Sequence, residues 1–215
     1  MERQVSAKAI KIKVCGMKYA DNISQLSVLK PDFMGFIFYP PSQRFVGLDF
    51  DKGVLKTVAN ETIKTAVFVN ATENEVLEFS LLYGMKAVQL HGEETPAFCS
   101  AIKASGLTVI KAFGVAEGFD FERLKEFETN VDYFLFDTKS LQYGGSGEIF
   151  DWALLSNYTL QIPFFLSGGL SLDNLADIEL NAHPQLFAID LNSKFELEPG
   201  LKDIKILEQA FLMIR

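Results

Sequence analysis

The chain has 215 residues, of which 48% are hydrophobic, and this is enough for a packed core in one large domain or two small ones. Its 20 Lys and Arg against 28 Asp and Glu give a net charge of −8, which argues against a broad basic surface for nucleic acid or anionic lipid. Residues 1–16 lack the apolar run of a secretory signal, and no segment approaches the roughly 18 apolar residues that span a bilayer, so we expect a cytoplasmic protein that binds neither nucleic acid nor membranes.

Short runs rich in Val, Ile and Phe recur at fairly even intervals along the chain and predict eight β-strands. In chain order the runs end at Cys15, Phe38, Asn70, His91, Phe113, Asp137, Ser167 and Asp190. Segments with helical spacing lie between most of them, including residues 72–83, 95–105, 120–128 and, after the last, 201–215.

This alternation of strand and helix predicts parallel strands joined by crossover helices. Eight such units favour a closed (β/α)₈ barrel, the TIM barrel, and a doubly wound open sheet is the alternative. No composition shift or charge run marks an internal boundary, so residues 1–215 are predicted to form a single domain.

Four of the eight predicted strand ends are Cys15, His91, Asp137 and Asp190, which are all polar. In barrels of this kind the active site lies at the C-terminal ends of the strands. A single polar end can simply mark the exit of a strand into solvent, but four at the same end indicate a site. Neither cysteine belongs to a CxxC pair, so both thiols are expected to be reduced, and His91 has no partners at metal-ligand spacing.

Strand parity places Lys13 on the same face as Cys15, and Gln89 on the same face as His91. If Cys15 points into the mouth of the barrel, Lys13 points there too. A neighbouring ammonium is then expected to lower the pKa of the thiol from about 8.5 and to increase the fraction of thiolate, which is the proton-accepting form.

Three loops contain features of a ligand site. Gly168 and Gly169 follow the seventh strand, and Asn192 and Ser193 follow the eighth, where this fold commonly binds phosphate through backbone N–H groups. The glycine-rich loop at residues 138–152 is either a mobile cover over the site or an ordinary connection.

Several motifs of the chain occur in the same order in a known family. They are "KVCGM" (13–17), "GFIFYPPSQRFV" (35–46), "AVFVN" (66–70), "VQLHG" (88–92), "FDT" (136–138), "GGSGEIFDW" (144–152), "LSGGL" (166–170) and "IDLNSKFELEPGLKD" (189–203). On these residues the chain resembles the phosphoribosylanthranilate isomerases of tryptophan biosynthesis along nearly its whole length. The resemblance implies a (β/α)₈ barrel that carries out an Amadori rearrangement of a small phosphorylated substrate without a metal or an organic cofactor.

The resemblance also implies residue roles. Cys15 would be the general base and Asp137 the general acid, and Arg44 of "SQR" would hold the anthranilate carboxylate. The phosphate would lie against the loops of Gly168 and Gly169 and of Asn192 and Ser193. The acid must be protonated, so a raised pKa is expected for Asp137. The family commonly has "SPR" where this chain has "SQR" (42–44), and a glycine at the position of Lys194.

Other candidates leave alternatives open. Cys99 lies in an apolar helical pattern and is expected to be a buried structural thiol, and His183 is expected to be a loop residue. His91 would either bind substrate or order its strand end, and Asp190 would either bind a sugar hydroxyl or orient the eighth loop. Competing functions are another phosphate-binding barrel enzyme, such as indole-glycerol-phosphate synthase or the histidine-pathway isomerase, and a catalytically silent binding barrel. Monomer and homodimer both remain open.

Overall fold

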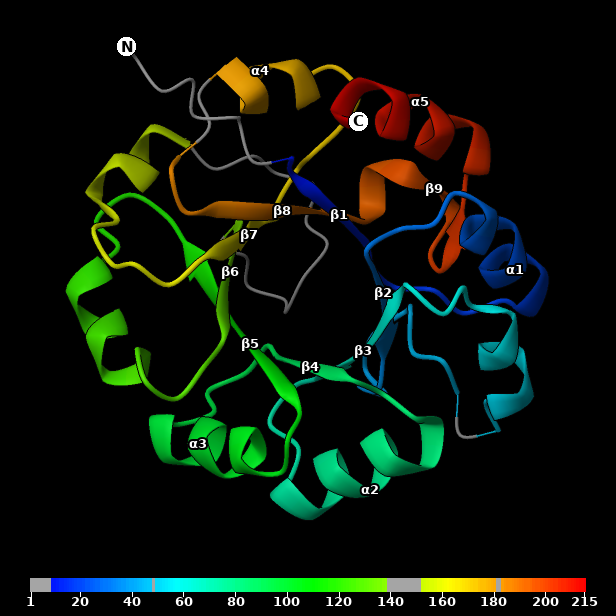
Figure 1. Ribbon diagram of the computed structural model, residues 1–215, viewed down its shortest axis with the longest axis horizontal. Helices are drawn as coiled ribbons and strands as arrows, with labels where there is room; N and C mark the ends of the chain where they lie inside the picture. Colours follow the sequence, from blue (N-terminus) through cyan, green and yellow to red (C-terminus); the bar gives the residue numbers. More distant parts are fainter. Residues whose placement is uncertain (1–8, 48, 139–151, 181–182) are drawn as a thin grey trace, which may run out of the picture.

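The computed structural model describes residues 9–47, 49–138, 152–180 and 183–215, and within them eight parallel strands close into a barrel (Figure 1). Each strand pairs with the next along the chain, and β8 pairs with β1. The strands are β1 (Lys11–Val14), β2 (Phe33–Ile37), β3 (Ile63–Phe68), β4 (Ala87–Leu90), β5 (Thr108–Val115), β6 (Tyr133–Thr138), β7 (Phe164–Leu166) and β8 (Leu186–Leu191). The predicted barrel and its eight strands are confirmed.

Helices surround this barrel on its outside, as the ring of coils in Figure 1 shows. The α-helices are α1 (Ala20–Val28), α2 (Glu73–Tyr83), α3 (Pro96–Ala104), α4 (Leu175–Leu180) and α5 (Ile204–Ile214). The 3₁₀ segments are η1 (Lys52–Thr57), η2 (Phe121–Phe127), η3 (Trp152–Asn157) and η4 (Ser193–Phe195), and a hairpin is formed by β9 (Glu196–Glu198) and β10 (Leu201–Lys202). No described helix is long and apolar enough to cross a membrane.

Two predicted helices differ from the structure. Where a helix was predicted over residues 120–128, the 3₁₀ helix η2 forms over Phe121–Phe127, and its buried residues Phe121, Leu124 and Phe127 recur every three positions, which is the 3₁₀ period. The segment 201–215 begins with strand β10, and its helix starts only after Asp203, whose carboxylate accepts from the N–H groups of Lys205 and Ile206.

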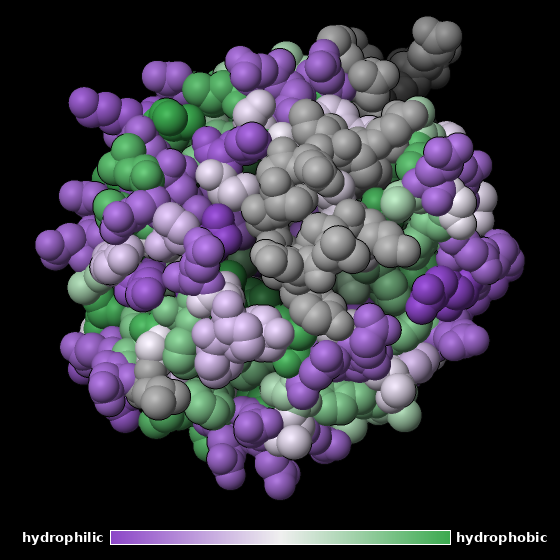
Figure 2. Space-filling model, turned by 180° about the vertical axis from the view of Figure 1, so that it is seen from behind, coloured by the Kyte–Doolittle hydropathy of each residue, from purple (hydrophilic) through white to green (hydrophobic). Residues whose placement is uncertain are grey.

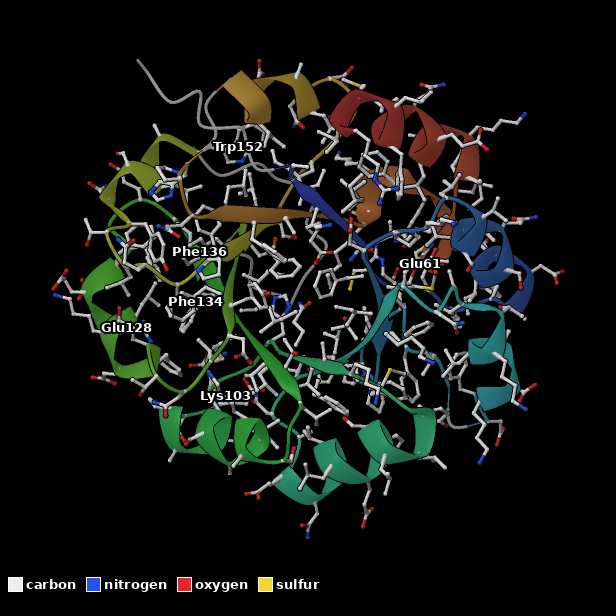
Figure 3. All side chains as sticks on the ribbon, in the orientation of Figure 1. Glu61, Lys103, Glu128, Phe134, Phe136 and Trp152 are labelled. Carbon is white, nitrogen blue, oxygen red and sulfur yellow. The ribbon has the colours of Figure 1, made fainter. Side chains whose placement is uncertain are left out.

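The barrel separates two hydrophobic clusters. The smaller one fills the inside and consists of Phe33, Ile110, Ala112, Leu135, Phe165 and Ala188. The larger one lies between the strands and the outer helices, and Cys99 is fully buried in it, as expected for a structural thiol. Phe134 and Phe136 extend from β6 into this outer layer (Figure 3), where both rings pack on Tyr158.

The inner face of the barrel changes character along the strands. The apolar inner cluster gives way toward the C-terminal strand ends to buried polar side chains, among them Lys13, Gln89 and Asp190. Figure 2 shows the side opposite to Figure 1, with hydrophilic residues around the edge and apolar residues nearer the centre. Because burying polar side chains is unfavourable, their concentration at this end of the interior indicates a functional site there.

Candidate active site

A small cavity lies at the C-terminal ends of the barrel strands. Its lining includes six of the nine predicted site residues: Cys15, Arg44, His91, Asp137, Asp190 and Asn192. Gly168, Gly169 and Ser193 are not among the lining residues. A larger open hollow of about 970 Å³ continues outward from His91 and Asp137 over the loops after β4 and β5. The cavity is the candidate site because it brings the thiol, the carboxylic acid and the arginine together.

The thiol of Cys15 directly follows β1, and its backbone N–H donates to the carbonyl of Leu191 in β8. The next residue, Gly16, has a φ of 79°, a conformation that favours glycine. A Cβ at this position would lie 2.7 Å from Cδ of Arg44. A glycine after the thiol therefore lets the arginine pass close beside it.

Lys13 points into the barrel together with Cys15, as parity predicts, and is fully buried. Its Nζ donates to Oδ2 of Asp190 at 2.6 Å and also hydrogen-bonds Cys15. Burial alone would lower the pKa of Lys13, but the charges of Asp190 and Cys15 raise it above its usual value. The ammonium therefore stays charged between the carboxylate and the thiol.

The predicted low pKa of Cys15 is wrong. Burial raises the pKa of this thiol more than Lys13 lowers it, and Asp190 raises it further, so the net shift is upward from 9.0. The physical reason is that the thiol is only 3% exposed and that much of the lysine charge is balanced by its own ion pair.

Asp190 uses one carboxylate oxygen for Lys13 and keeps the other free. Its Oδ1 is buried and has no hydrogen-bond partner among the described residues. A buried acceptor without a donor is unfavourable unless a ligand supplies one. This geometry favours the expectation that Asp190 accepts from a substrate hydroxyl.

Asp137 is the last residue but one of β6 and is 8% exposed. Its Oδ1 accepts from the N–H of Thr138 at 2.8 Å, and its carboxylate also accepts from the side chain of Ser167. Burial nevertheless raises the pKa of Asp137 to about 6, with a smaller upward contribution from Asp190. The expected rise in the pKa of this residue is confirmed.

His91 faces Asp137, with 3.6 Å between Nε2 and Oδ2. Burial, together with the charges of Lys111 and Lys13, lowers the pKa of His91 to about 3, so the ring is neutral at physiological pH. The side-chain amide of Gln89 donates to Nδ1 at 2.8 Å, which places the ring proton on Nε2, toward Asp137. His91 therefore presents an N–H group to the cavity.

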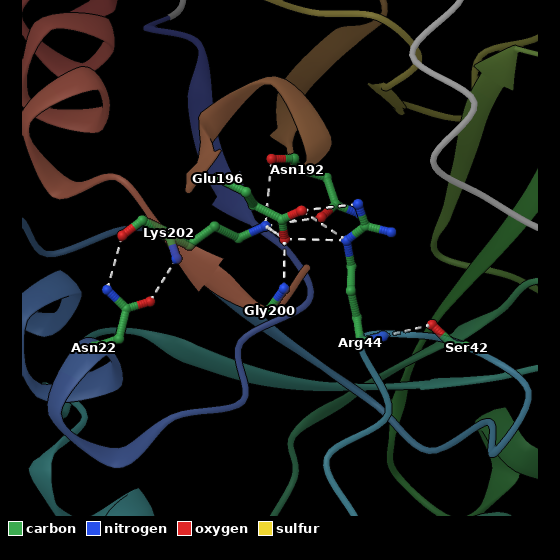
Figure 4. Close-up of polar contacts among 7 residues, drawn as sticks. All are labelled: Asn22, Ser42, Arg44, Asn192, Glu196, Gly200 and Lys202. Carbon is green, nitrogen blue, oxygen red and sulfur yellow. Dashed lines mark hydrogen bonds and ion pairs between the residues drawn. The ribbon is translucent and has the colours of Figure 1, made fainter. Parts of the chain in front are cut away.

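Arg44 lies in a turn after β2 that is closed by a hydrogen bond from Phe45 N to the carbonyl of Ser42. Its side chain is already bound to Glu196 of β9. Nε donates to both oxygens of Glu196 at 3.0 Å, and Nη2 donates to Oε2 at 2.8 Å (Figure 4). The sequence predicted Arg44 as a carboxylate-binding group but did not predict this partner.

The predicted phosphate loops lie next to these groups. Gly168 has a φ of 87°, and a Cβ there would be 2.6 Å from the N of Thr138 and 3.0 Å from Oδ1 of Asp137. Asn192 accepts through its side-chain oxygen from Nζ of the buried Lys202 at 2.8 Å. Ser193 begins the 3₁₀ segment η4.

Glu196 and Lys202 are the functional candidates that the sequence analysis missed. They flank the Pro199–Gly200 turn of the β9–β10 hairpin. The alternation of polar and apolar residues around this Pro-Gly pair is the signal that would have predicted the hairpin. Most of the predicted cover loop, residues 139–151, lies outside the described residues. Within the described part of the chain, no three His, Cys, Asp or Glu side chains gather as they would around a metal ion.

Comparison with known proteins gives consistent matches over nearly the full chain. A family model described as N-(5'phosphoribosyl)anthranilate (PRA) isomerase matches residues 12–212. An N-(5'-phosphoribosyl)anthranilate isomerase from Parabacteroides distasonis is 44% identical over 204 residues, which is 94% of this chain and 92% of the relative.

Two solved structures agree with this. The phosphoribosyl anthranilate isomerase of Thermotoga maritima is 32% identical, with a TM-score of 0.81 over 94% of this chain and 97% of that one. A phosphoribosyl anthranilate isomerase in complex with reduced 1-(o-carboxyphenylamino)-1-deoxyribulose 5-phosphate is 29% identical, with a TM-score of 0.79 over 94% and 96%.

Proposed function

Because this chain belongs to the N-(5'-phosphoribosyl)anthranilate isomerase family, we propose that Cys15 and Asp137 perform the reaction of that family as general base and general acid. The chain is an enzyme of tryptophan biosynthesis that converts N-(5-phosphoribosyl)anthranilate into 1-(2-carboxyphenylamino)-1-deoxyribulose 5-phosphate, an Amadori rearrangement. The observation that carries the assignment of roles is that Cys15, Asp137 and Arg44 line one cavity, although they come from different strand ends.

Asp137 is suited to the first step. The carboxylic acid donates its proton to the ribose ring oxygen as the C1–O bond breaks, and the nitrogen lone pair forms the C=N bond of a Schiff base. A pKa of about 6, well above the usual 3.8, makes it easier for Asp137 to take up and donate a proton near neutral pH. The N–H of Thr138 and the hydroxyl of Ser167 then stabilise the carboxylate that remains.

Cys15 is suited to the second step. Its thiolate removes the proton from C2 of the sugar, and the resulting enolamine tautomerises to the aminoketone product. Burial keeps the resting thiol protonated; its proton moves to Asp137, which donates it to the ring oxygen in the first step, and the ammonium of Lys13 stabilises the thiolate that remains. The other partner of Lys13, Asp190, offers its free Oδ1 to a sugar hydroxyl.

The remaining groups hold the two ends of the substrate. Arg44 receives the anthranilate carboxylate through the part of its guanidinium that does not contact Glu196. The phosphate lies against the backbone of Gly168 and Gly169 after β7 and of Asn192 and Ser193 after β8. The Nε2–H group of His91 donates a hydrogen bond to the substrate or to Asp137. A single domain over residues 1–215 is supported by the barrel, whose strands extend from Lys11 to Leu191.

The test follows the loss of anthranilate-type fluorescence with freshly prepared phosphoribosylanthranilate. We expect Cys15→Ser and Asp137→Asn each to lower the rate by at least about 10²-fold, the usual scale for losing an acid or a base. Cys99→Ala and Asp173→Asn are matched controls that remove a thiol and a carboxylate outside the cavity, and both should keep most of the activity. Full activity in both cavity variants would disprove the assigned roles.

A further inference from the structure

Arg44 already binds a carboxylate of the protein, that of Glu196, in addition to lining the cavity. Its guanidinium has two edges that can each bind a carboxylate through two N–H groups. Glu196 occupies the edge formed by Nε and Nη2. Nη1 makes no hydrogen bond to any described residue, and Figure 4 shows this nitrogen pointing away from Glu196. The second edge, Nη1 with Nη2, is therefore available to a ligand in the cavity that Arg44 lines.

Glu196 is held firmly in its place. Its side chain is 4% exposed, and besides Arg44 its Oε1 accepts from the N–H of Gly200 at 3.1 Å and from Nζ of Lys202 at 2.6 Å. Burial alone would raise the pKa of Glu196, but its contacts with Arg44 and Lys202 lower it, so the group is a carboxylate. A fixed carboxylate of this kind limits the orientations that Arg44 can take.

Lys202 is fully buried and is fixed at both its backbone and its side chain. Its backbone exchanges two hydrogen bonds with the side chain of Asn22 in α1, at 2.9 and 2.7 Å. Its Nζ contacts Glu196 and the Oδ1 of Asn192, in the loop after β8 (Figure 4). The lysine thus links the arginine to the loop in which phosphate binding is proposed.

The charges of the three side chains decide what the cluster attracts. Arg44 and Glu196 alone would form a neutral pair, which has little attraction for an anionic group. Burial lowers the pKa of Lys202 to about 8, and the ammonium is still mostly charged at neutral pH. The cluster of Arg44, Glu196 and Lys202 therefore carries one net positive charge beside the cavity.

We propose that Glu196 and Lys202 are positioning residues for the carboxylate on the substrate's aromatic ring. Glu196 turns the free edge of Arg44 toward the cavity, and Lys202 supplies the charge that keeps this edge attractive to an anion. The inference rests on the proposed function, because it concerns how that same site selects an ortho-carboxylated aryl amine over an aryl amine without the carboxylate.

The experiment compares two substrates, phosphoribosylanthranilate and the phosphoribosyl derivative of aniline, which lacks the carboxylate. Glu196→Gln and Lys202→Met are each expected to lower kcat/KM for the first substrate by at least about tenfold, mainly through KM, and to change it less than about threefold for the second. Lys202→Arg keeps the charge and should keep the preference for the carboxylated substrate.

The matched controls are Glu198→Gln, which is exposed in the same strand as Glu196, and Lys205→Met, which is exposed on α5. Neither should change the ratio of kcat/KM between the two substrates. Circular dichroism and urea unfolding establish which variants are folded. If Glu196→Gln does not fold, the comparison of Lys202→Met with Lys202→Arg tests the inference by itself. Equal losses on both substrates, or no loss, would overturn the inference. A wild type that does not isomerise phosphoribosylanthranilate would instead refute the proposed function.

Discussion

Replacing Asp137 with asparagine is expected to remove the acid and, at the same time, to stabilise the protein at neutral pH. Burial raises the pKa of this carboxyl from 3.8 to about 6, so its charged form is less favourable in the folded state than in the unfolded state. This rise of about two pH units corresponds to about 3 kcal/mol of unfolding free energy lost when the group is charged. For a raised pKa, stability is fully present below pH 3.8 and is lost as the pH rises through 6.

Asparagine keeps the shape of the side chain and an oxygen that can accept from the N–H of Thr138, but it carries no charge to bury. We therefore expect Asp137→Asn to raise the free energy of unfolding by up to about 3 kcal/mol at pH 8, and by about 2 kcal/mol less at pH 4. Urea unfolding followed by circular dichroism at both pH values measures this difference.

Asp173→Asn removes an exposed carboxylate and serves as the control. A change in stability for Asp137→Asn that does not depend on pH would refute the argument. It would mean that Asp137 is not desolvated enough to serve as an acid in the unbound enzyme.

Two further predictions concern the neighbours of the thiol. Lys13→Met leaves the carboxylate of Asp190 buried without its partner at 2.6 Å and should lower the free energy of unfolding by about 3–5 kcal/mol. Combining Lys13→Met with Asp190→Asn should recover most of this loss. Denaturant unfolding of the wild type, the two single variants and the double variant measures the coupling, and a double variant that loses the sum of the two single losses would contradict it. Gly16→Ala should displace Arg44, because the new Cβ would lie 2.7 Å from its Cδ, and should raise KM for phosphoribosylanthranilate at least about tenfold in steady-state kinetics. Gly106→Ala also places a side chain at a positive φ, of 88°, but meets nothing within 4 Å, so a similar rise in KM there would argue against the contact with Arg44.

The strands and the polar residues at their ends could be predicted from sequence because both follow from local rules. Alternation and β-branched runs mark the strands, and the topology of eight βα units brings their ends to one face. Cys15, His91, Asp137 and Asp190 could therefore be expected in one site before any coordinates. Arg44, which does not lie at a strand end, was predicted only from the resemblance to a known family.

The partners of Arg44 could not be predicted in the same way. Glu196 lies 152 positions away from it, and only the closure of the barrel between β8 and β1 brings the hairpin of β9 and β10 beside the loop after β2. Local patterns indicate the turn at Pro199 and Gly200, but they do not indicate what a charge on that hairpin contacts. Long-range ion pairs of this kind become visible only in the folded structure.

The raised pKa of Cys15 affects where the proton lies before the reaction. Between the pKa values of Asp137 and Cys15 the pair carries one proton, and in the unbound enzyme this proton lies on the sulfur. The proposed chemistry needs it on the carboxyl, which is the less favourable arrangement in the unbound enzyme because the pKa of the thiol is the higher of the two. Since both arrangements hold the same number of protons, their ratio does not change with pH in this range. The binding energy of the substrate's carboxylate and phosphate, which lie away from the reacting carbons, is the source from which the enzyme can offset this cost.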